Sequence, residues 1–422
     1  MKILWLVNVK LPEVSYISGE KPQPYGGWLT GASIQLSMKN DVELAICFPE
    51  LECKTINRYE GDKIFYYGFR KIFGTNSSIL CYEKLFDKII MDFKPDLVHV
   101  FGTEFSHSLS MVNVCKNKDI VYVLSIQGLV SQISEYYYSD LPFRVIYGYS
   151  IRNIIKGDPL FVQKKEMTKR GNIEIETINK TQNIIGRTTW DKACIERLNP
   201  KASYFHCNEI LRNSFYENKW NYDDCRKYSI FLVQGQTPIK GLHYVLHALS
   251  IVIKDYPEMK LFICGYNNIN KCGVIDKFKV TNYEKYIEKL IKRFKLGSSI
   301  NFLGKLDEKE MVSMYLKSNI FICSSSIENS SNSLSEAMLI GVPCIASYVG
   351  GVPDLLEHKE EGFLYQHNDS TMLSYYIKRI FQDSQLAKKM SRKARLKALL
   401  INDRAKNTDE LINIYNKISV KE

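Results

Sequence analysis

Two glutamates, Glu328 and Glu336, are separated by seven residues in a stretch rich in serine and asparagine. A carboxylate accepts hydrogen bonds from two adjacent hydroxyl groups, as ribose and sugar rings present them. If both carboxylates face one ligand, they can bind a molecule that carries several hydroxyl groups. The pair therefore predicts a site for a sugar, a ribose, or a molecule that contains both.

The residues around this pair also predict an anion site. The apolar run 320–323 indicates a buried strand, and residues 333–340 have the pattern of a helix. Backbone N–H groups and the helix dipole at such a helix start attract negative charge. Small polar side chains can add hydrogen-bond donors there without bulk: Asn329, Ser330, Asn332 and Ser333.

A purely structural interpretation of the same residues stays open. Ser333 and Glu336 have the spacing of a capping box, in which Glu336 would bond only to the start of its own helix. Glu328 would then be a solvated loop residue. The two roles of Glu336 do not exclude each other.

In the first half of the chain, glycine and polar residues follow several expected strands. Gly26 and Gly27 form a pair that lets the backbone approach a ligand closely, although such a pair often marks only a turn. His99 lies inside an apolar run and is interpreted as a core residue. Residues expected after strands, and therefore candidates for a site, are Glu104, His107, Gln127, Gly128 and Arg187. An arginine at a helix start opposes the helix dipole and suggests an anionic ligand, but a surface arginine fits nearly as well.

These candidates require a scaffold of strands and helices. Short aliphatic runs alternate with amphipathic segments of helical length, which is typical of parallel α/β layers. Strands are predicted at 2–9, 42–47, 97–101, 120–125, 183–185, 229–233, 260–264, 299–302, 320–323 and 343–346. Helices are predicted at 30–38, 82–93, 188–198, 241–254, 283–294, 308–317 and 333–340. Sheets of this kind bind ligands at the carboxyl ends of their strands.

A length of 422 residues indicates more than one domain. The irregular, aromatic stretch 207–227 separates two sets of strands. We predict one domain at 1–210 and a second at 225–399, with a C-terminal helix at about 400–422 that packs back on the first. The predicted fold class is α/β, with two doubly wound, Rossmann-like parallel sheets facing each other across a cleft.

The composition narrows the partners and the compartment. A formal charge of +11 favours an anionic partner, such as nucleic acid, a nucleotide or an acidic lipid surface. The eleven cysteines are scattered without a Cys-x-x-Cys pair, which argues against a disulfide framework and a zinc site. No signal peptide and no apolar run of ~20 residues is recognisable. We therefore expect a cytoplasmic protein, at most peripheral on a membrane.

The stretch 143–171 is apolar and basic at the same time. Its apolar residues recur near helical spacing, and seven lysines and arginines accompany them. Basic amphipathic helices lie on anionic lipid surfaces. A helix packed on the domain core, with a solvated basic face, is the alternative.

Four motifs in order resemble the donor-site block of glycosyltransferase family 4. They are the Glu328/Glu336 pair, the run 337–347, the segment 350–354 and the segment 361–364. The likeness extends over about residues 229–366, and more loosely over the first half. It implies a GT-B fold with an acceptor-side first domain and a donor-binding second domain. It also implies a retaining transferase that needs no metal and no cofactor, and that uses a nucleoside-diphosphate sugar as donor.

The resemblance also implies roles for individual residues. Glu328 would bind the hydroxyl groups of the donor sugar, Glu336 the ribose, and the N–H groups of Asn332, Ser333 and Leu334 the distal phosphate. Lys240 would stabilise the diphosphate leaving group. Gly26 and Gly27 would lie against the diphosphate, and His107 near the donor sugar, while Gln127 and Gly128 would face the acceptor.

This chain departs from the family pattern at one position. The family carries an arginine followed by a lysine, and Gln234 occupies the place of that arginine. A glutamine can donate to a phosphate but adds no charge. We therefore expect the phosphate side to depend on Lys240 and the helix start.

The predicted function is transfer of a sugar to a glycan or lipid-linked glycan in the synthesis of a bacterial cell-surface polysaccharide, such as a capsule. The alternatives are a nucleotide-sugar epimerase of similar two-domain fold and a non-catalytic nucleotide-sugar-binding protein. Nucleic acid is not expected as a partner, because aromatic and basic residues form no stacking motif. An anionic membrane surface, contacted through 143–171, is a further expected partner.

Overall fold

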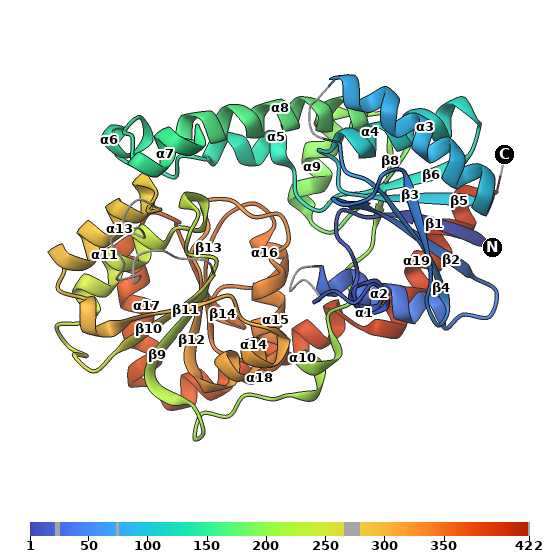
Figure 1. Cartoon of the computed structure of the whole chain (residues 1–422). Coiled ribbons are helices and arrows are strands. Elements are labelled where there is room, and N and C mark those ends of the chain that lie inside the picture. The colour runs from blue at the N-terminus through green and yellow to red at the C-terminus, as the bar shows by residue number, and fades with distance from the viewer. Residues whose placement is uncertain (22–25, 73–75, 266–278, 421–422) are drawn as a thin grey trace. The chain divides into compact units, whose positions relative to one another are not determined.

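A computed structural model describes residues 1–21, 26–72, 76–265 and 279–420 of the chain (Figure 1). Contacts divide the chain into two compact units. The first unit comprises Met1–Gln132, Thr168–Arg212 and Asn402–Glu422, and the second comprises Ile133–Met167 and Asn213–Ile401. The sequence predicts a change of domain only near 207–227 and near 400. The contacts add two more changes, on either side of Ile133–Met167.

The first unit is built on an eight-stranded sheet in the order β3-β4-β2-β1-β5-β6-β7-β8. All neighbours pair parallel except β3 and β4, which are antiparallel at one edge. The strands are β1 (Lys2–Leu6), β2 (Glu43–Glu50), β3 (Ile56–Glu60), β4 (Ile64–Arg70), β5 (Leu97–Phe101), β6 (Val121–Ser125), β7 (Asn183–Gly186) and β8 (Ser203–His206).

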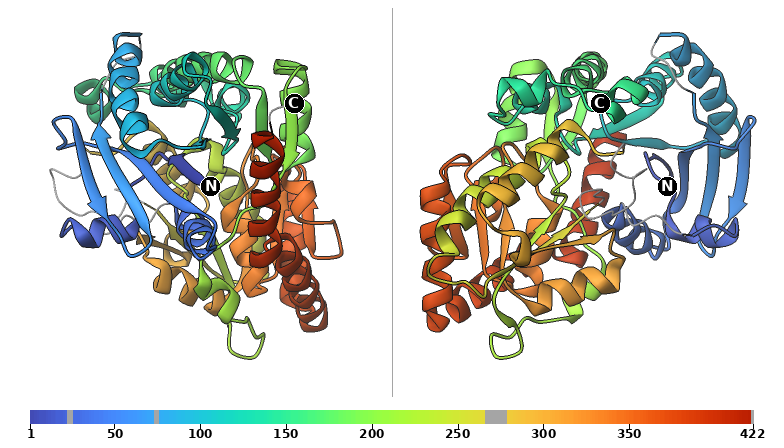
Figure 2. Two further views of the ribbon diagram at one scale, coloured as in Figure 1. Left: turned by 90° about the vertical axis from the view of Figure 1, so that its right-hand side faces the viewer. Right: turned by 60° about the vertical axis from the view of Figure 1, so that its left-hand side comes forward.

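Helices cover both faces of this sheet. They are α1 (Pro12–Ile17), α2 (Gly27–Ser37), α3 (Asn76–Phe93), α4 (Ser106–Asn117), α5 (Val130–Ile133), α8 (Leu160–Asn179), α9 (Thr189–Leu198) and α19 (Arg404–Ser419). Successive side chains of β1 face opposite sides, so that Leu4 packs in one apolar cluster and Trp5 in the other. Phe86 of α3 belongs to the first cluster, and Tyr415 of α19 to the second. Figure 2 shows α19 as the red helix that leads to the C-terminus.

The second unit contains a six-stranded, fully parallel sheet in the order β11-β10-β9-β12-β13-β14. The strands are β9 (Arg226–Val233), β10 (Lys260–Cys264), β11 (Ile300–Gly304), β12 (Ser318–Cys323), β13 (Cys344–Ser347) and β14 (Gly362–Tyr365). The chain builds outward from β9 in one direction and then returns to β12 on the other side. The carboxyl ends of β9 and β12 therefore form the switch point, where such sheets bind ligands.

The helices of the second unit come from two separate parts of the chain. The first part precedes α8 and contains η1 (Ser134–Tyr136), α6 (Phe143–Ile146) and α7 (Ile151–Lys156). The remainder are α10 (Asn213–Glu217), η2 (Pro238–Lys240), α11 (Leu242–Val252), α13 (Asn282–Arg293), η3 (Gly297–Ser299), α14 (Glu308–Lys317), α15 (Asn332–Ile340), α16 (Val352–Leu355), α17 (Ser370–Gln382) and α18 (Ser384–Ile401).

Hydrogen bonds fix the early segment Ile133–Met167 to α11 and α13. His243 of α11 contacts the carbonyl oxygen of Ser139 through Nε2 at 2.9 Å, and the Tyr244 hydroxyl donates to the same oxygen at 2.7 Å. Asn282, at the start of α13, donates through Nδ2 to the carbonyl of Val145 at 2.7 Å. These partners lie about a hundred residues apart in the chain, so local sequence patterns do not indicate them.

The predicted fold class is confirmed in its two parallel, Rossmann-like sheets. The strands β5 and β10 coincide with the predicted ranges 97–101 and 260–264. Strands β3, β4, β8 and β14 were not predicted. Polar or aromatic residues interrupt β3, β4 and β8, and β14 is only four residues long. Within the described ranges, no helix combines the length and apolar character that crossing a bilayer requires.

The folded chain should lose stability as the pH falls below about 6.5, because the histidines of the unfolded chain then take up protons. Burial lowers the pKa of His243 to about 4 and that of His107 to about 3, so the folded chain does not take up those protons. For each such histidine, the free energy of unfolding falls by up to ~1.4 kcal/mol per pH unit as the pH drops from about 6.5 to the pKa of the folded state. Urea unfolding at pH 7, 6 and 5 measures this slope.

The substitution His243→Gln should flatten the pH dependence, because it removes one group that only the unfolded chain protonates. His206→Gln, at an exposed position, is the matched control and should keep the wild-type slope. Equal slopes for the two variants would contradict the assignment.

Candidate functional site

The candidate site of the second unit lies where β9 and β12 end side by side. Gln234 follows β9, and the loop that contains Glu328 follows β12. Gln234 has a left-handed backbone, with φ of 63°, and its N–H donates to the carbonyl of Cys264 at 2.8 Å. This turn leads the chain into η2, which carries Lys240. The strand order therefore places Lys240 and the Glu328 loop at one edge of the sheet.

Lys240 and Glu328 form an ion pair between these two segments. Ser325 strengthens it by donating through Oγ to Glu328 Oε1 at 2.7 Å. Burial by itself lowers the pKa of Lys240, but the neighbouring Glu328 carboxylate outweighs burial and raises that pKa above its usual value. Lys240 therefore keeps its positive charge, and an anionic ligand would have to compete with Glu328 for it.

Helix α15 starts without a side-chain cap. Its N-cap residue is Ser331, and no side chain accepts a hydrogen bond from the first turn at that position. The capping box predicted as an alternative for Ser333 and Glu336 is therefore not formed. The hydroxyl of the buried Tyr315 lies 3.0 Å from the Ser333 carbonyl oxygen and 3.4 Å from Glu336 Oε2. Tyr315 thus helps to orient Glu336 at the helix start.

Two glycines allow the backbone segments of this site to pack closely. A Cβ atom on Gly350 would lie 1.9 Å from the carbonyl oxygen of Glu328, and one on Gly241 would lie 2.0 Å from that of Ser324. Both glycines have positive φ, of 50° and 71° respectively. The Gly351 N–H also donates to the Glu328 carbonyl, at 3.1 Å. The loop from Ser324 to Glu328 is therefore held through its main chain at both of its ends.

The structure brings most of the predicted donor residues into one region. Gln234, Lys240, Glu328 and Ser333 line one small pocket, together with Ser324 and Ser325. The other predicted residues lie on the same loop and helix but do not line that pocket: Asn329, Asn332, Leu334 and Glu336. Leu334 is fully buried, so only its backbone N–H suits a ligand.

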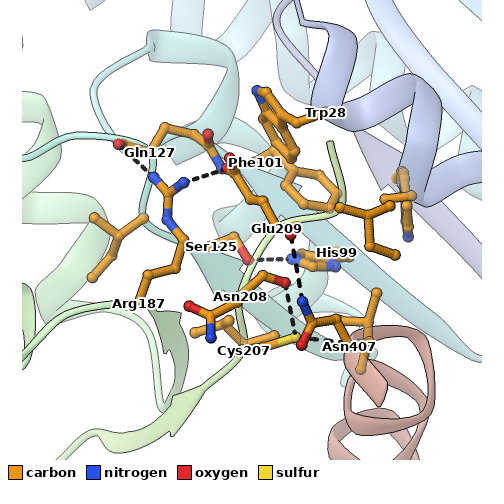
Figure 3. A pocket seen from close by; sticks show the side chains of 16 residues that line it. Trp28, His99, Phe101, Ser125, Gln127, Arg187, Cys207, Asn208, Glu209 and Asn407 are labelled. Atoms are coloured by element: carbon orange, nitrogen blue, oxygen red, sulfur yellow. Dashed lines mark hydrogen bonds and ion pairs between the residues drawn. The ribbon is translucent and has the colours of Figure 1, made fainter. Parts of the chain in front are cut away.

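The first unit has its own pocket, of about 50 Å³, at the carboxyl ends of β5 to β8 (Figure 3). Trp28 and Phe101 form an aromatic wall, and the predicted residues Gln127 and Arg187 also line it. Arg187 is buried and pairs through Nη1 with Glu209 at 2.6 Å. Its Nη2 donates to the Gln127 carbonyl at 3.0 Å. The charge of Arg187 is therefore balanced within the unit.

His107 and Glu104 lie outside this pocket. His107 is buried, its Nε2 lies 2.6 Å from Asn8 Oδ1, and burial lowers its pKa to about 3. It is therefore neutral at physiological pH. Glu104 accepts from Arg170 Nη2 at 2.7 Å. His99 is confirmed as a buried core residue, because its ring nitrogens contact Tyr415 and Ser125.

Glu174, which the sequence did not single out, holds the loop that contains Gly128. The fully buried Glu174 accepts from the Val130 and Ser131 N–H groups at 3.0 and 2.9 Å, and from Thr103 Oγ1 at 2.5 Å. Burial raises the pKa of this carboxyl group. Glu174 lies four residues before the buried Ile178, and this helical spacing was the signal in the sequence that could have indicated its burial.

Gly26 and Gly27 stand at the start of α2. Gly26 is the N-cap, with φ of 74°, and a Cβ on Gly27 would lie 2.4 Å from Arg212 Cδ. Packing inside the unit already explains both glycines. Tyr25, which precedes them in the motif, lies outside the described residues.

Residues 216–397 match the family described as Glycosyl transferases group 1. A curated relative, N-acetyl-alpha-D-glucosaminyl L-malate synthase of Bacillus anthracis, is 33% identical over 110 residues, which are 26% of this chain and 28% of that enzyme. The first curated relatives are matched over 28 to 48% of their own length.

Solved structures resemble the whole chain in fold. Sucrose-phosphate synthase from Thermosynechococcus elongatus has a TM-score of 0.69 at 15% identity, with 99% of each chain covered. Anabaena Alr3699/HepE in complex with UDP-glucose has a TM-score of 0.65 at 15% identity, covering 99% of this chain and 100% of that one.

Gly350→Ala should destabilise the second unit and displace Glu328. The added Cβ would collide with the Glu328 carbonyl, and the left-handed backbone adds strain, so we expect a loss of about 2 kcal/mol or more. Thermal unfolding measures the loss. Gly297→Ala is the matched control, since no atom lies within 4 Å of its Cβ position. Equal stability of the two variants would show that the close approach at Gly350 does not constrain the loop.

Proposed function

We propose that the chain transfers a sugar from a nucleoside-diphosphate sugar to an acceptor hydroxyl group, since residues 216–397 match the family described as Glycosyl transferases group 1. One observation supports the proposal most. Lys240, Glu328 and the uncapped start of α15 meet at the switch point of the second sheet. The Lys240 ammonium group and the backbone N–H groups at the start of α15 suit a diphosphate. The Glu328 carboxylate suits the hydroxyl groups of a sugar joined to that diphosphate.

Each residue then has a definite role in the proposal. Glu336 binds the ribose hydroxyls, and the first N–H groups of α15, at Asn332, Ser333 and Leu334, bind the distal phosphate. Lys240 leaves its pair with Glu328 and stabilises the growing charge of the leaving diphosphate. Glu328 is then released to bind the donor sugar. Asn329 adds polar contacts on the same loop.

Gln234 supplies a neutral donor on the phosphate side, so the positive charge comes from Lys240 and the helix dipole. With these two sources of charge, we propose that no metal ion or other cofactor takes part. Gly26 and Gly27 are proposed to lie near the diphosphate only as backbone. Their side-chain space is already taken up by Val9 and Arg212.

We propose that the reaction retains the configuration at the anomeric carbon. The leaving phosphate would take the proton of the attacking hydroxyl on the same face of the sugar, and the protein would supply position and charge. His107, neutral at physiological pH, would act as a hydrogen-bonding residue rather than as a cation.

The proposed acceptor is a glycan or lipid-linked glycan of the bacterial cell surface, as in capsule synthesis. The pocket lined by Trp28, Gln127 and Arg187 supports this choice. An aromatic wall packs against sugar rings, and carbonyl and guanidinium groups bond to their hydroxyls. Gly128 and Glu104 lie on the neighbouring loops. We propose that the chain works at the cytoplasmic face of the membrane.

Glu336→Ala and Lys240→Met should each weaken binding of nucleoside diphosphates by about ten- to a hundredfold, because each removes a charge-assisted hydrogen bond. Thermal stabilisation by UDP, GDP and their sugars measures the binding, since a ligand that binds only the folded chain raises its stability. Glu288→Ala, on the exposed face of α13, is the control and should bind as the wild type does. If Glu336→Ala bound equally well, the ribose assignment would be wrong.

With the correct donor and a lipid-linked glycan, the chain should release the nucleoside diphosphate and form one glycosidic bond, with or without EDTA. NMR of the product reports the anomeric configuration, which should match that of the donor. An epimerised sugar nucleotide without transfer would favour the epimerase alternative. Binding of a donor without release to any acceptor would favour a non-catalytic protein.

A further inference from the structure

Helix α7 presents its apolar residues to solvent. Ile151, Ile154 and Ile155 are 48%, 66% and 73% exposed, and their spacing places them on one face of the helix. Asn153, on the other face, is only 2% exposed. A surface helix of a globular protein normally shows the reverse arrangement. The exposed face therefore indicates that something else covers it.

Hydrogen bonds hold α7 in this orientation. Asn153 Nδ2 donates to the carbonyl oxygen of Asp158 at 3.1 Å, and Asn153 Oδ1 accepts from Ser150 Oγ at 2.7 Å. The Asn282 N–H of α13 donates to the same Asn153 Oδ1 at 3.1 Å. The buried side chain is thus fully paired, and rotating the isoleucines inward would break these bonds.

Exposed aromatic residues extend this face toward α6. Phe143 is 73% exposed, and its ring centroid lies 4.4 Å from that of Tyr147. Phe161 contacts both Tyr147, at 5.8 Å, and Tyr149, at 6.0 Å. We call the exposed residues of this face the α6–α7 surface: Phe143, Tyr147, Tyr149, Ile151, Ile154 and Ile155. In Figure 1, α6 and α7 lie beside α13.

Basic residues accompany the α6–α7 surface. Arg144, Lys156 and Lys165 are exposed. The stretch 143–171 contains seven lysines and arginines against two acidic residues, Asp158 and Glu166, and Asp158 pairs with Arg152 at 2.6 Å. The surface therefore combines apolar side chains with an excess of positive charge. Its charge complements an anionic layer and opposes a second copy of the same face.

We infer that the α6–α7 surface docks on an anionic lipid bilayer. The isoleucines would enter the boundary of the acyl chains, the tyrosines would lie at headgroup level, and Arg144 and Lys156 would contact the lipid phosphates. The inference deepens the proposed function, on which it rests for the lipid-linked acceptor. It also assigns the contact to the second unit, which carries Lys240 and Glu328.

Sedimentation with phosphatidylcholine vesicles, with and without phosphatidylglycerol, tests this inference without any turnover. The wild type should bind the anionic vesicles, and less so as salt rises. Ile154→Asp combined with Ile155→Asp should lower the partition coefficient about tenfold or more, because two apolar anchors become charges. Arg144→Ala with Lys156→Ala should weaken binding and flatten its salt dependence.

Met91→Asp, at an exposed apolar position of α3, is the matched control and should bind as the wild type does. Each variant is first shown to keep the wild-type unfolding temperature and its stabilisation by the sugar nucleotide. Wild-type protein that stays in the supernatant would overturn the inference, and so would an isoleucine variant that still binds. Loss of a dimer in that variant, without vesicle binding by the wild type, would assign the face to a second copy. Vesicle binding without stabilisation by any nucleotide would contradict the proposed function and leave the membrane surface standing.

Discussion

The ion pair between Lys240 and Glu328 is the contact on which the candidate site depends. It joins the segment after β9 to the segment after β12, the two neighbouring strands at the switch point of the second sheet. Removing one partner of a largely buried pair costs several kcal/mol, about 3–5, so each segment constrains the other. The pair also keeps the site electrically balanced until an anion arrives. In the proposed function, a diphosphate takes the place of Glu328 beside Lys240, and Glu328 then binds hydroxyl groups.

Backbone contacts position this pair more than side-chain contacts do. The main chain of the Glu328 loop lies too close to Gly241 and Gly350 for a Cβ atom on either residue. Close approach of this kind fixes the position of the main chain from which the Glu328 side chain extends. Ser324 and Ser325 of the loop have small side chains, which leave space for the pocket. Gly350 and Gly351 of the motif 350–354 therefore hold the Glu328 loop through its main chain.

The sequence predicted those parts of the fold whose signal is local. Strands β5 and β10 are apolar except for His99 and Lys260. Their predicted ends are correct because a parallel strand covered on both faces has a nearly continuous apolar run. Strand β8, with the residues Ser203–His206, has no such run, and only its parallel pairing with β7 identifies it as a strand. The capping box at Ser333 and Glu336 had the correct spacing, but the helix begins at Asn332, and Glu336 approaches Tyr315 instead. Spacing alone could not show this, since Tyr315 comes from another helix.

The segment Ile133–Met167 shows a second limit of local patterns. Its apolar and basic residues were visible in the sequence, but its place in the second unit depends on His243, Tyr244 and Asn282, far along the chain. The same distant bonds decide which face of α7 is inside. Burying Asn153 satisfies its amide and leaves three isoleucines in water, an arrangement that gives up apolar burial unless another surface supplies it.

The α6–α7 surface and the Lys240–Glu328 pair belong to one compact unit. A bilayer contact at that surface would therefore set the height of the nucleotide site above the membrane, whatever position the first unit takes.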